Sequence, residues 1–126
     1  MEPTLPTLIP RYKIWIETSD SQGILGDGKW ILLKTIQQTG TLTAAVEKLG
    51  ITYRKTWNNI KKIEKILGFP LLETKRGGSE GGASVLTVQG QMIVKAFDRF
   101  HAGFDEKAQQ AFMQFLQDME AVRELK

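Results

Sequence analysis

Cysteine is absent from this 126-residue chain, and histidine occurs only once, as His101. Without cysteine the chain forms neither disulfides nor thiolate-based catalytic or zinc sites. A single imidazole without such partners does not make a zinc site of recognisable spacing, so we interpret His101 as a helix-surface or interface residue. No cluster of acids and bases indicates an enzyme either. We expect no catalytic residue, no metal and no cofactor.

Long apolar runs are missing as well. None approaches the roughly 20 residues that cross a bilayer, and the N-terminus lacks the basic-then-apolar pattern of a signal peptide. Residues 1–10 instead carry three of the four prolines, which indicates a poorly ordered arm. With 41% hydrophobic and 25% charged residues, the chain suits one domain with its own core. We expect it in the cytoplasm, without a membrane partner.

A strong net charge is also lacking, since the formal value is only +3. The charges are nevertheless unevenly distributed. Between Arg54 and Arg76 there are seven bases against two acids, whereas from Asp98 onward six acids outnumber four bases. A basic middle and an acidic tail suggest that one face of the protein meets a phosphate backbone.

The first half of the chain has the pattern of a short hairpin followed by three helices. Tyr12, Ile14 and Ile16 alternate with Lys13, Trp15 and Glu17, the period of a strand, and Ile24-Leu25 can return as a second strand. Helical spacing then predicts helices over 28–39, 41–49 and 52–67. Each of these is followed by a glycine that is expected to end it, Gly40 in a left-handed conformation, and Thr41 and Thr52 are expected to cap the second and third.

The second half predicts another hairpin and a long final helix. Residues 70–74 and 85–86 are expected to be strands on either side of a loop, Lys75 to Ser84, that holds four glycines. Thr87 is expected to cap a helix that stays periodic to the end, with Gly103 a candidate point for a bend or break. The fold class is therefore mainly α with small β-hairpins: a winged helix-turn-helix with a long C-terminal helix.

The central signal is the pair of short helices joined by a tight turn at Gly50. Small side chains at Ala44 and Ala45 let the two helices cross closely, and the third helix begins with polar and charged side chains. Such a helix inserts its N-terminal end into a major groove, and its amides favour a phosphate. The plainer alternative is an ordinary helical hairpin with a solvated basic face.

The glycine-rich loop strengthens the first interpretation, because a basic tip between two short strands is what a DNA-binding wing needs. A solvated mobile hairpin is the plain alternative. A nucleotide-binding loop fits poorly, since no Lys-Ser or Lys-Thr pair follows the glycines and the loop leads to a strand.

Four segments together carry a family resemblance: residues 41–45, 51–57, 71–78 and 81–87. They resemble the N-terminal DNA-binding domain of molybdate-dependent (ModE-like) transcriptional regulators, which is related to the LysR-type DNA-binding domain. The resemblance implies a winged helix-turn-helix that dimerises through flanking helices and binds a palindromic promoter element. Full-length members continue into molybdate-binding β-barrel domains. This chain ends before any could begin, so we do not expect it to sense molybdate by itself.

Carried onto this chain, the resemblance starts the recognition helix at Thr52 and makes Lys75 to Gly82 the wing. Arg54 is the best single candidate for a base or phosphate contact, because its planar donors pair with guanine or clamp a phosphate. Tyr53 either contacts a phosphate or packs against the protein. Trp57 either packs against the first helix or the wing, or lies near the sugar-phosphate backbone of the DNA. Both pairs of alternatives stay open. The candidate DNA-binding residues are Thr43, Thr52, Tyr53, Arg54, Lys55, Asn58, Lys61, Lys62, Lys75, Arg76, Gly77 and Gly78.

The final helix carries more apolar surface than one helix leaves in water. The core takes part of it, and we expect a second subunit to cover the rest; the candidate dimer-interface residues are Phe97, Phe100, Phe104, Phe112 and Phe115. The expected organisation is an arm (1–10), a winged helix-turn-helix (11–86, wing 71–86) and a helical dimerisation segment (87–126). A homodimer would present two recognition helices about 34 Å apart, one turn of DNA.

The sequence therefore predicts a homodimeric, sequence-specific regulator of transcription whose partner is double-stranded DNA. The alternative is a protein-interaction module that kept the winged-helix fold and lost DNA binding. An unidentified effector or partner protein stays open in both cases.

Overall fold

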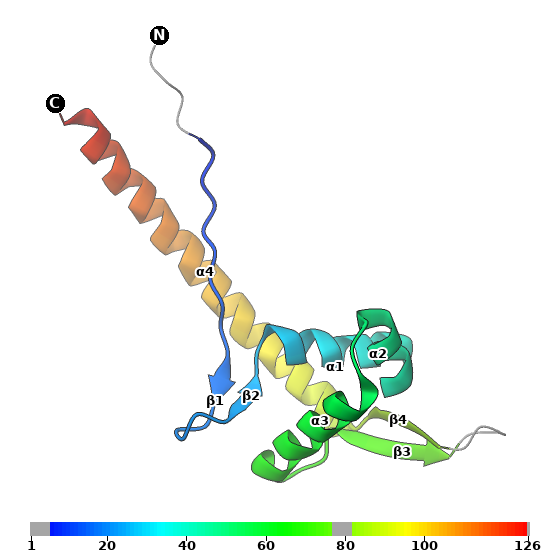
Figure 1. The fold of residues 1–126 in the computed structure, drawn as a ribbon. Coiled ribbons are helices and arrows are strands. Elements are labelled where there is room, and N and C mark those ends of the chain that lie inside the picture. Colours follow the sequence, from blue (N-terminus) through cyan, green and yellow to red (C-terminus); the bar gives the residue numbers. More distant parts are fainter. Residues whose placement is uncertain (1–5, 77–81, 126) are drawn as a thin grey trace.

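The computed structural model describes residues 6–76 and 82–125. Figure 1 shows the chain as a small helical body from which a two-stranded ribbon and one long helix project. This arrangement confirms the expected winged helix-turn-helix with a long C-terminal helix. In chain order the elements are β1 (Ile16–Glu17), β2 (Gly23–Leu25), α1 (Asp27–Thr39), α2 (Leu42–Leu49), α3 (Tyr53–Leu67), β3 (Leu72–Arg76), β4 (Gly82–Leu86) and α4 (Val88–Glu124).

The ends of the first three helices are set by local chemistry, largely as predicted. Gly40, Gly50 and Gly68 follow α1, α2 and α3 in the left-handed conformation, with φ of 97°, 68° and 86°. The hydroxyl of Thr41 accepts a hydrogen bond from the main-chain N–H of Ala44 at 3.1 Å, which caps α2. Thr52 does occupy the cap position of α3, but its side chain makes no capping hydrogen bond.

The core lies where α1, α2, α3 and the start of α4 meet. Helix α1 contacts α2, α4 and β4, and α2 contacts α3. Each helix contributes its apolar stripe, as the 3.6-residue period predicts. The most deeply buried large side chains are Ile36, Leu42, Ile60, Leu71 and Phe97.

The wing is the antiparallel hairpin of β3 and β4, and its strands are longer than predicted. The register runs from Leu72 opposite Leu86 to Arg76 opposite Gly82. Lys75 and Ser84, which the sequence placed in a loop, therefore belong to the ladder. Glycine and charge marked them as loop residues, but main-chain pairing extends through such residues once the register is set. The remaining part of the predicted loop, residues 77–81, lies outside the described residues.

The N-terminal hairpin is present but much shorter than the alternation predicted. Only Ile16 and Glu17 pair with β2, and the register shifts between them. The chain before β1 runs beside α4 instead (Figure 1), where the ring of Tyr12 stacks on His101 at 6.2 Å between centroids. The prediction of a strand over Tyr12–Trp15 was wrong. This segment contacts α4 through Tyr12 instead of pairing with β2.

Helix α4 is one continuous helix of 37 residues, so Gly103 does not break it. At its start the hydroxyl of Thr87 accepts a hydrogen bond from Gly90 N at 2.9 Å, as predicted. Gly90 is buried against the main chain, since a Cβ there would lie 2.6 Å from the carbonyl oxygen of Leu71. Beyond its first turns α4 projects away from the body (Figure 1). No helix in the described part of the chain is long and apolar enough to cross a membrane.

Candidate nucleic-acid interface

Helix α3 has an inner apolar face and an outer basic one. Thr56, Ile60 and Ile63 are buried and fall on one side at helical spacing. The opposite side carries exposed polar and basic side chains: Arg54, Lys55, Asn58, Lys62 and Lys65. Within residues 6–76 and 82–125, no acidic side chain forms an ion pair with any of these four bases. The outer face therefore keeps its positive charge.

The N-terminal end of α3 is open to solvent. Thr52, Tyr53 and Arg54 are all exposed, and the hydroxyl of Thr56 is used internally, donating to the carbonyl oxygen of Thr52 at 2.7 Å. Because no side chain caps this end, its main-chain N–H groups and the positive end of the helix dipole remain available to an anion. Thr43, in the first turn of α2, is exposed too.

One edge of α3 carries a stack of side chains. The rings of Tyr53 and Trp57 are stacked at 6.2 Å and 10°, and the Lys61 ammonium lies 4.4 Å from the Trp57 ring centroid. Trp57 is half-buried and packs against the core, which favours the packing alternative for this residue. Lys61 also pairs with Glu64 at 3.0 Å, so its charge is partly neutralised, unlike that of Lys62.

Glu64 ties this edge of α3 to the start of the wing. Its Oε2 accepts hydrogen bonds from the main-chain N–H groups of Leu71 at 2.7 Å and Leu72 at 2.9 Å. Burial acts to raise the pKa of Glu64, but the hydrogen bonds from Leu72 and Leu71 and the charge of Lys61 outweigh it, so the pKa is lowered. An ionised Glu64 thus fixes the wing relative to α3. Sequence inspection missed this role, because no local pattern links Glu64 to main-chain N–H groups seven and eight residues later.

The other edge of α3 borders a hollow of about 400 Å³ beside the start of α1. Lys55 and Asn59 line it from α3, Thr52 from the cap position before α3, and Gly28 and Lys29 from α1. Asn59 and Lys29 were not among the predicted site residues. Asn59 was within reach of the sequence, since it lies four residues after Lys55 on the same helical edge. Lys29 was not, because only the packing of α1 against α3 brings it there.

The wing contributes the second part of the basic surface. Lys75 is exposed on β3 opposite Ala83, and Arg76 ends the strand opposite Gly82. The ribbon of β3 and β4 projects away from the helical body (Figure 1). The predicted contacts at residues 77 and 78 lie outside the described residues.

The candidate dimer residues of α4 divide into two groups. Phe97 is only 2% exposed and packs in the core of its own chain, with its ring 5.2 Å from that of Trp30. Phe97 therefore has no surface left for a partner, and the prediction that it is a dimer-interface residue was wrong. Phe100, Phe104 and Phe115 are 39%, 46% and 54% exposed, and Phe112 is half-buried.

His101 lies in an aromatic cluster at the junction of the N-terminal segment, α1 and α4. Its ring stacks on Trp30 at 4.7 Å, and its Nδ1 lies 3.1 Å from Asp105 Oδ2. The indole N–H of Trp30 in turn donates to Asp98 Oδ1 at 2.6 Å. In the ranges that the structure describes, no group of three or more potential metal ligands occurs.

Comparison with known families agrees with this geometry. Residues 29–91, which run from α1 through the wing to the start of α4, match the bacterial regulatory helix-turn-helix proteins of the lysR family. The matched region contains the outer face of α3, Glu64 and the described wing residues.

Individual relatives match over 53% to 69% of the chain. Similarity to the transcriptional regulator ModE of Haemophilus influenzae is 32% identity over 87 residues, 69% of this chain and 32% of that protein. For the molybdenum-pterin-binding protein MopB of Rhodobacter capsulatus it is 30% over 79 residues, 63% of this chain and 29% of the relative. The DNA-binding transcriptional dual regulator ModE of Escherichia coli K12 is 33% identical over 67 residues, which are 53% of this chain and 26% of that protein. The matches thus span about a third or less of each relative.

Proposed function

This chain belongs to the bacterial regulatory helix-turn-helix proteins of the lysR family, and we propose that it is a sequence-specific DNA-binding regulator of transcription that acts as a homodimer. One observation carries the proposal: the outer face of α3 keeps four exposed bases without an acidic partner among the described residues. That face lies beside a wing with an exposed lysine. Two relatives that match this chain are named as transcriptional regulators.

In the proposed complex the two ends of α3 have different tasks. The open N-terminal end enters the major groove, where Arg54 reads a base and Thr52, Tyr53, Lys55 and Asn58 contact bases or phosphates nearby. Lys62 in α3 and Lys75 and Arg76 in the wing contact phosphates, which supply affinity and register without reading sequence. Lys61 contributes less, because Glu64 and Trp57 already engage its ammonium.

The exposed phenylalanines of α4 support the homodimer. A helix of 37 residues is about 55 Å long, and only Gly90, Val94 and Phe97 of it are buried. Phe100, Phe104 and Phe115 follow at helical spacing and are 39%, 46% and 54% exposed. A second copy of α4 would bury this stripe and set two recognition helices against a palindromic site.

Fluorescence anisotropy with a selected duplex and a random duplex tests the assignment. We expect Arg54→Ala to weaken binding of the selected duplex by about 1–3 kcal/mol and to relax the preference at one base pair. Lys75→Ala should weaken binding of both duplexes to a similar extent. Lys107→Ala, a lysine exposed on the projecting part of α4, is the matched control and should leave both affinities unchanged. Equal losses on both duplexes for Arg54→Ala and Lys75→Ala would contradict the division of tasks.

The alternative function, a protein-interaction module without DNA binding, gives a different result in the same assay. It predicts no binding of either duplex even at low salt. The regulator predicts binding that weakens steeply as salt rises, because phosphate contacts release counterions.

The homodimer is tested separately by sedimentation. Phe104→Glu places a charge in the exposed stripe and should shift the chain toward a monomer, whereas Gln114→Glu, on an exposed part of the same helix, should not. A wild-type chain that sediments as a monomer at 100 times the concentration used for DNA binding would contradict the homodimer.

A further inference from the structure

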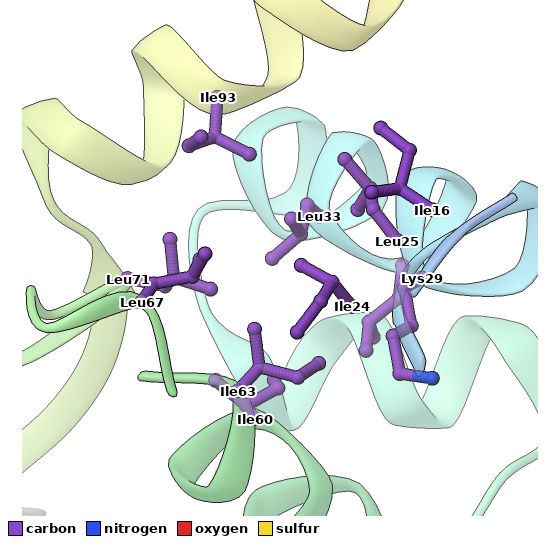
Figure 2. Close-up of a pocket in the computed structure, with 11 residues that line it drawn as sticks. Ile16, Ile24, Leu25, Lys29, Leu33, Ile60, Ile63, Leu67, Leu71 and Ile93 are labelled. Carbon is purple, nitrogen blue, oxygen red and sulfur yellow. The ribbon is translucent and has the colours of Figure 1, made fainter. Parts of the chain in front are cut away.

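An apolar cavity of about 180 Å³ lies behind the recognition helix. It is partly open and is lined by the N-terminal hairpin, α1, the inner face of α3, the segment before β3, and α4. Figure 2 shows side chains from these elements converging on it, among them Ile24, Leu33, Ile63 and Leu71. Its wall is otherwise made by Ile16, Leu25, Lys29, Leu32, Ile60, Leu67 and Ile93.

The size and chemistry of the cavity define what it accepts. Ten of the eleven lining residues are isoleucine or leucine, and the eleventh is Lys29. An apolar protein cavity of roughly 150 Å³ stays dry and binds benzene. A cavity of this kind therefore suits a single aromatic ring or a short branched hydrocarbon and rejects an isolated charge.

A polar basin adjoins the cavity and shares two of its residues, Lys29 and Ile63. The basin is lined further by Ser21, Gln22 and Gly23 of the hairpin and by Asn59, Lys62 and Ile66 of α3. In Figure 2 the nitrogen of Lys29 lies at the outer end of its stem, away from the apolar wall. Lys29 is half-buried, and among the described residues no carboxylate pairs with it or with Lys62.

From this juxtaposition we propose that the cavity and the basin form one binding site for a small aromatic or branched aliphatic carboxylate. The hydrocarbon part fills the cavity, and the carboxylate lies in the basin beside the ammonium groups of Lys29 and Lys62. A charge-assisted contact to Lys29 distinguishes this ligand from a neutral hydrocarbon of the same size.

Occupancy of this site acts on the helix that we propose reads DNA. Ile60, Ile63 and Leu67 line the cavity from the inner face of α3, whereas Arg54 lies on its outer face. A ligand that changes how α3 packs on α1 changes DNA affinity, and by linkage DNA changes ligand affinity by the same factor. This regulatory consequence rests on the proposed function, whereas the binding site itself does not.

The test is a titration of the full chain, without DNA, followed by NMR of isoleucine methyl groups. Benzoate and toluene serve as the carboxylate and neutral probes. We expect both to shift the methyl signals of Ile24, Ile63 and Ile93 and to leave that of Ile9, outside the cavity, unchanged. Absence of saturable shifts with both probes up to about 10 mM would overturn the proposal. Shifts that follow protein concentration instead would also overturn it, because they would identify a second copy as the occupant.

Charge substitution separates the two halves of the site. Lys29→Met keeps the apolar stem and removes the ammonium, so benzoate should bind about fivefold more weakly while toluene binds within twofold of wild type, as for a single partly exposed ion pair. Lys48→Met, at an exposed position of α2, should change neither. Equal effects of Lys29→Met on both probes would refute the role of the ammonium.

Anisotropy with the selected duplex then tests the coupling alone. At saturating benzoate we expect at least a threefold change in DNA affinity for the wild type. Unchanged affinity with methyl shifts intact would overturn the coupling and leave the binding site standing. Failure to bind DNA at all would contradict the proposed function without touching the methyl titration.

Discussion

Glu64→Ala should loosen the wing from the recognition helix and destabilise the whole domain. The carboxylate accepts two main-chain hydrogen bonds, from Leu71 and Leu72, which are only 2% and 3% exposed. Hydrogen bonds to a charged group contribute about 1.5–3 kcal/mol each. The Glu64 side chain is 11% exposed, so water can reach part of the space that the alanine leaves. We therefore expect Glu64→Ala to lower the free energy of unfolding by about 2–4 kcal/mol.

Glu64→Gln refines the test. The amide keeps one carbonyl oxygen that can accept from the same N–H groups, but it loses the charge and the ion pair with Lys61. Its expected cost is about 1–2 kcal/mol. Urea unfolding followed by tryptophan fluorescence measures both variants, with Glu47→Ala, exposed on α2, as the control within about 0.5 kcal/mol of wild type. A Glu64→Ala loss no larger than that of the control would refute the reasoning.

The pH dependence of the same difference has a defined sign. The pKa of Glu64 in the folded chain lies below its ordinary value of 4.5. Its stabilising effect is therefore fully present above that value and is lost as pH falls through the folded pKa. The difference in unfolding free energy between wild type and Glu64→Gln should stay constant from about pH 7 to 5.5 and shrink below about pH 4.5. A difference that grows on acidification would contradict the assignment.

Three further predictions concern the scaffold. Gly90→Ala forces a Cβ to 2.6 Å from the Leu71 carbonyl oxygen and should cost about 1–3 kcal/mol. At Gly103 an added Cβ would meet nothing within 4 Å, so Gly103→Ala should instead stabilise α4 by up to about 1 kcal/mol. Equal changes in the thermal unfolding midpoints of the Gly90→Ala and Gly103→Ala variants would refute the close packing of Gly90 on Leu71. Trp30→Phe should cost about 1–2 kcal/mol in urea unfolding through its lost hydrogen bond to Asp98, and no loss would contradict that bond. Thr41→Ala should cost about 1 kcal/mol by removing the α2 cap, whereas Thr52→Ala should cost less, and the reverse order by circular dichroism would refute the cap assignment.

Local chemistry made the helices predictable from the sequence. Gly40, Gly50 and Gly68 end helices where the sequence predicted, all three in the left-handed conformation, and the apolar period of α3 identified its buried face at Thr56 and Ile60. These features depend on residues within one or two turns of each other, which is the range over which sequence pattern carries information.

Contacts between distant segments were not predictable in the same way. The bond from Glu64 to the start of the wing and the approach of Lys29 to α3 arise only when helices pack. The same applies to Phe97, whose spacing alone did not tell a core residue from an interface residue. Tyr12 is a further case, because its contact with His101 replaces the pairing that alternation predicted.

The central claim is that the outer face of α3 and the wing together bind duplex DNA. Mapping amide chemical-shift changes on titration with a duplex tests it most directly. We expect the largest changes over residues 52–65 and at Lys75, and none over residues 105–124 of α4. Changes confined to α4, or no changes at low salt, would contradict the claim.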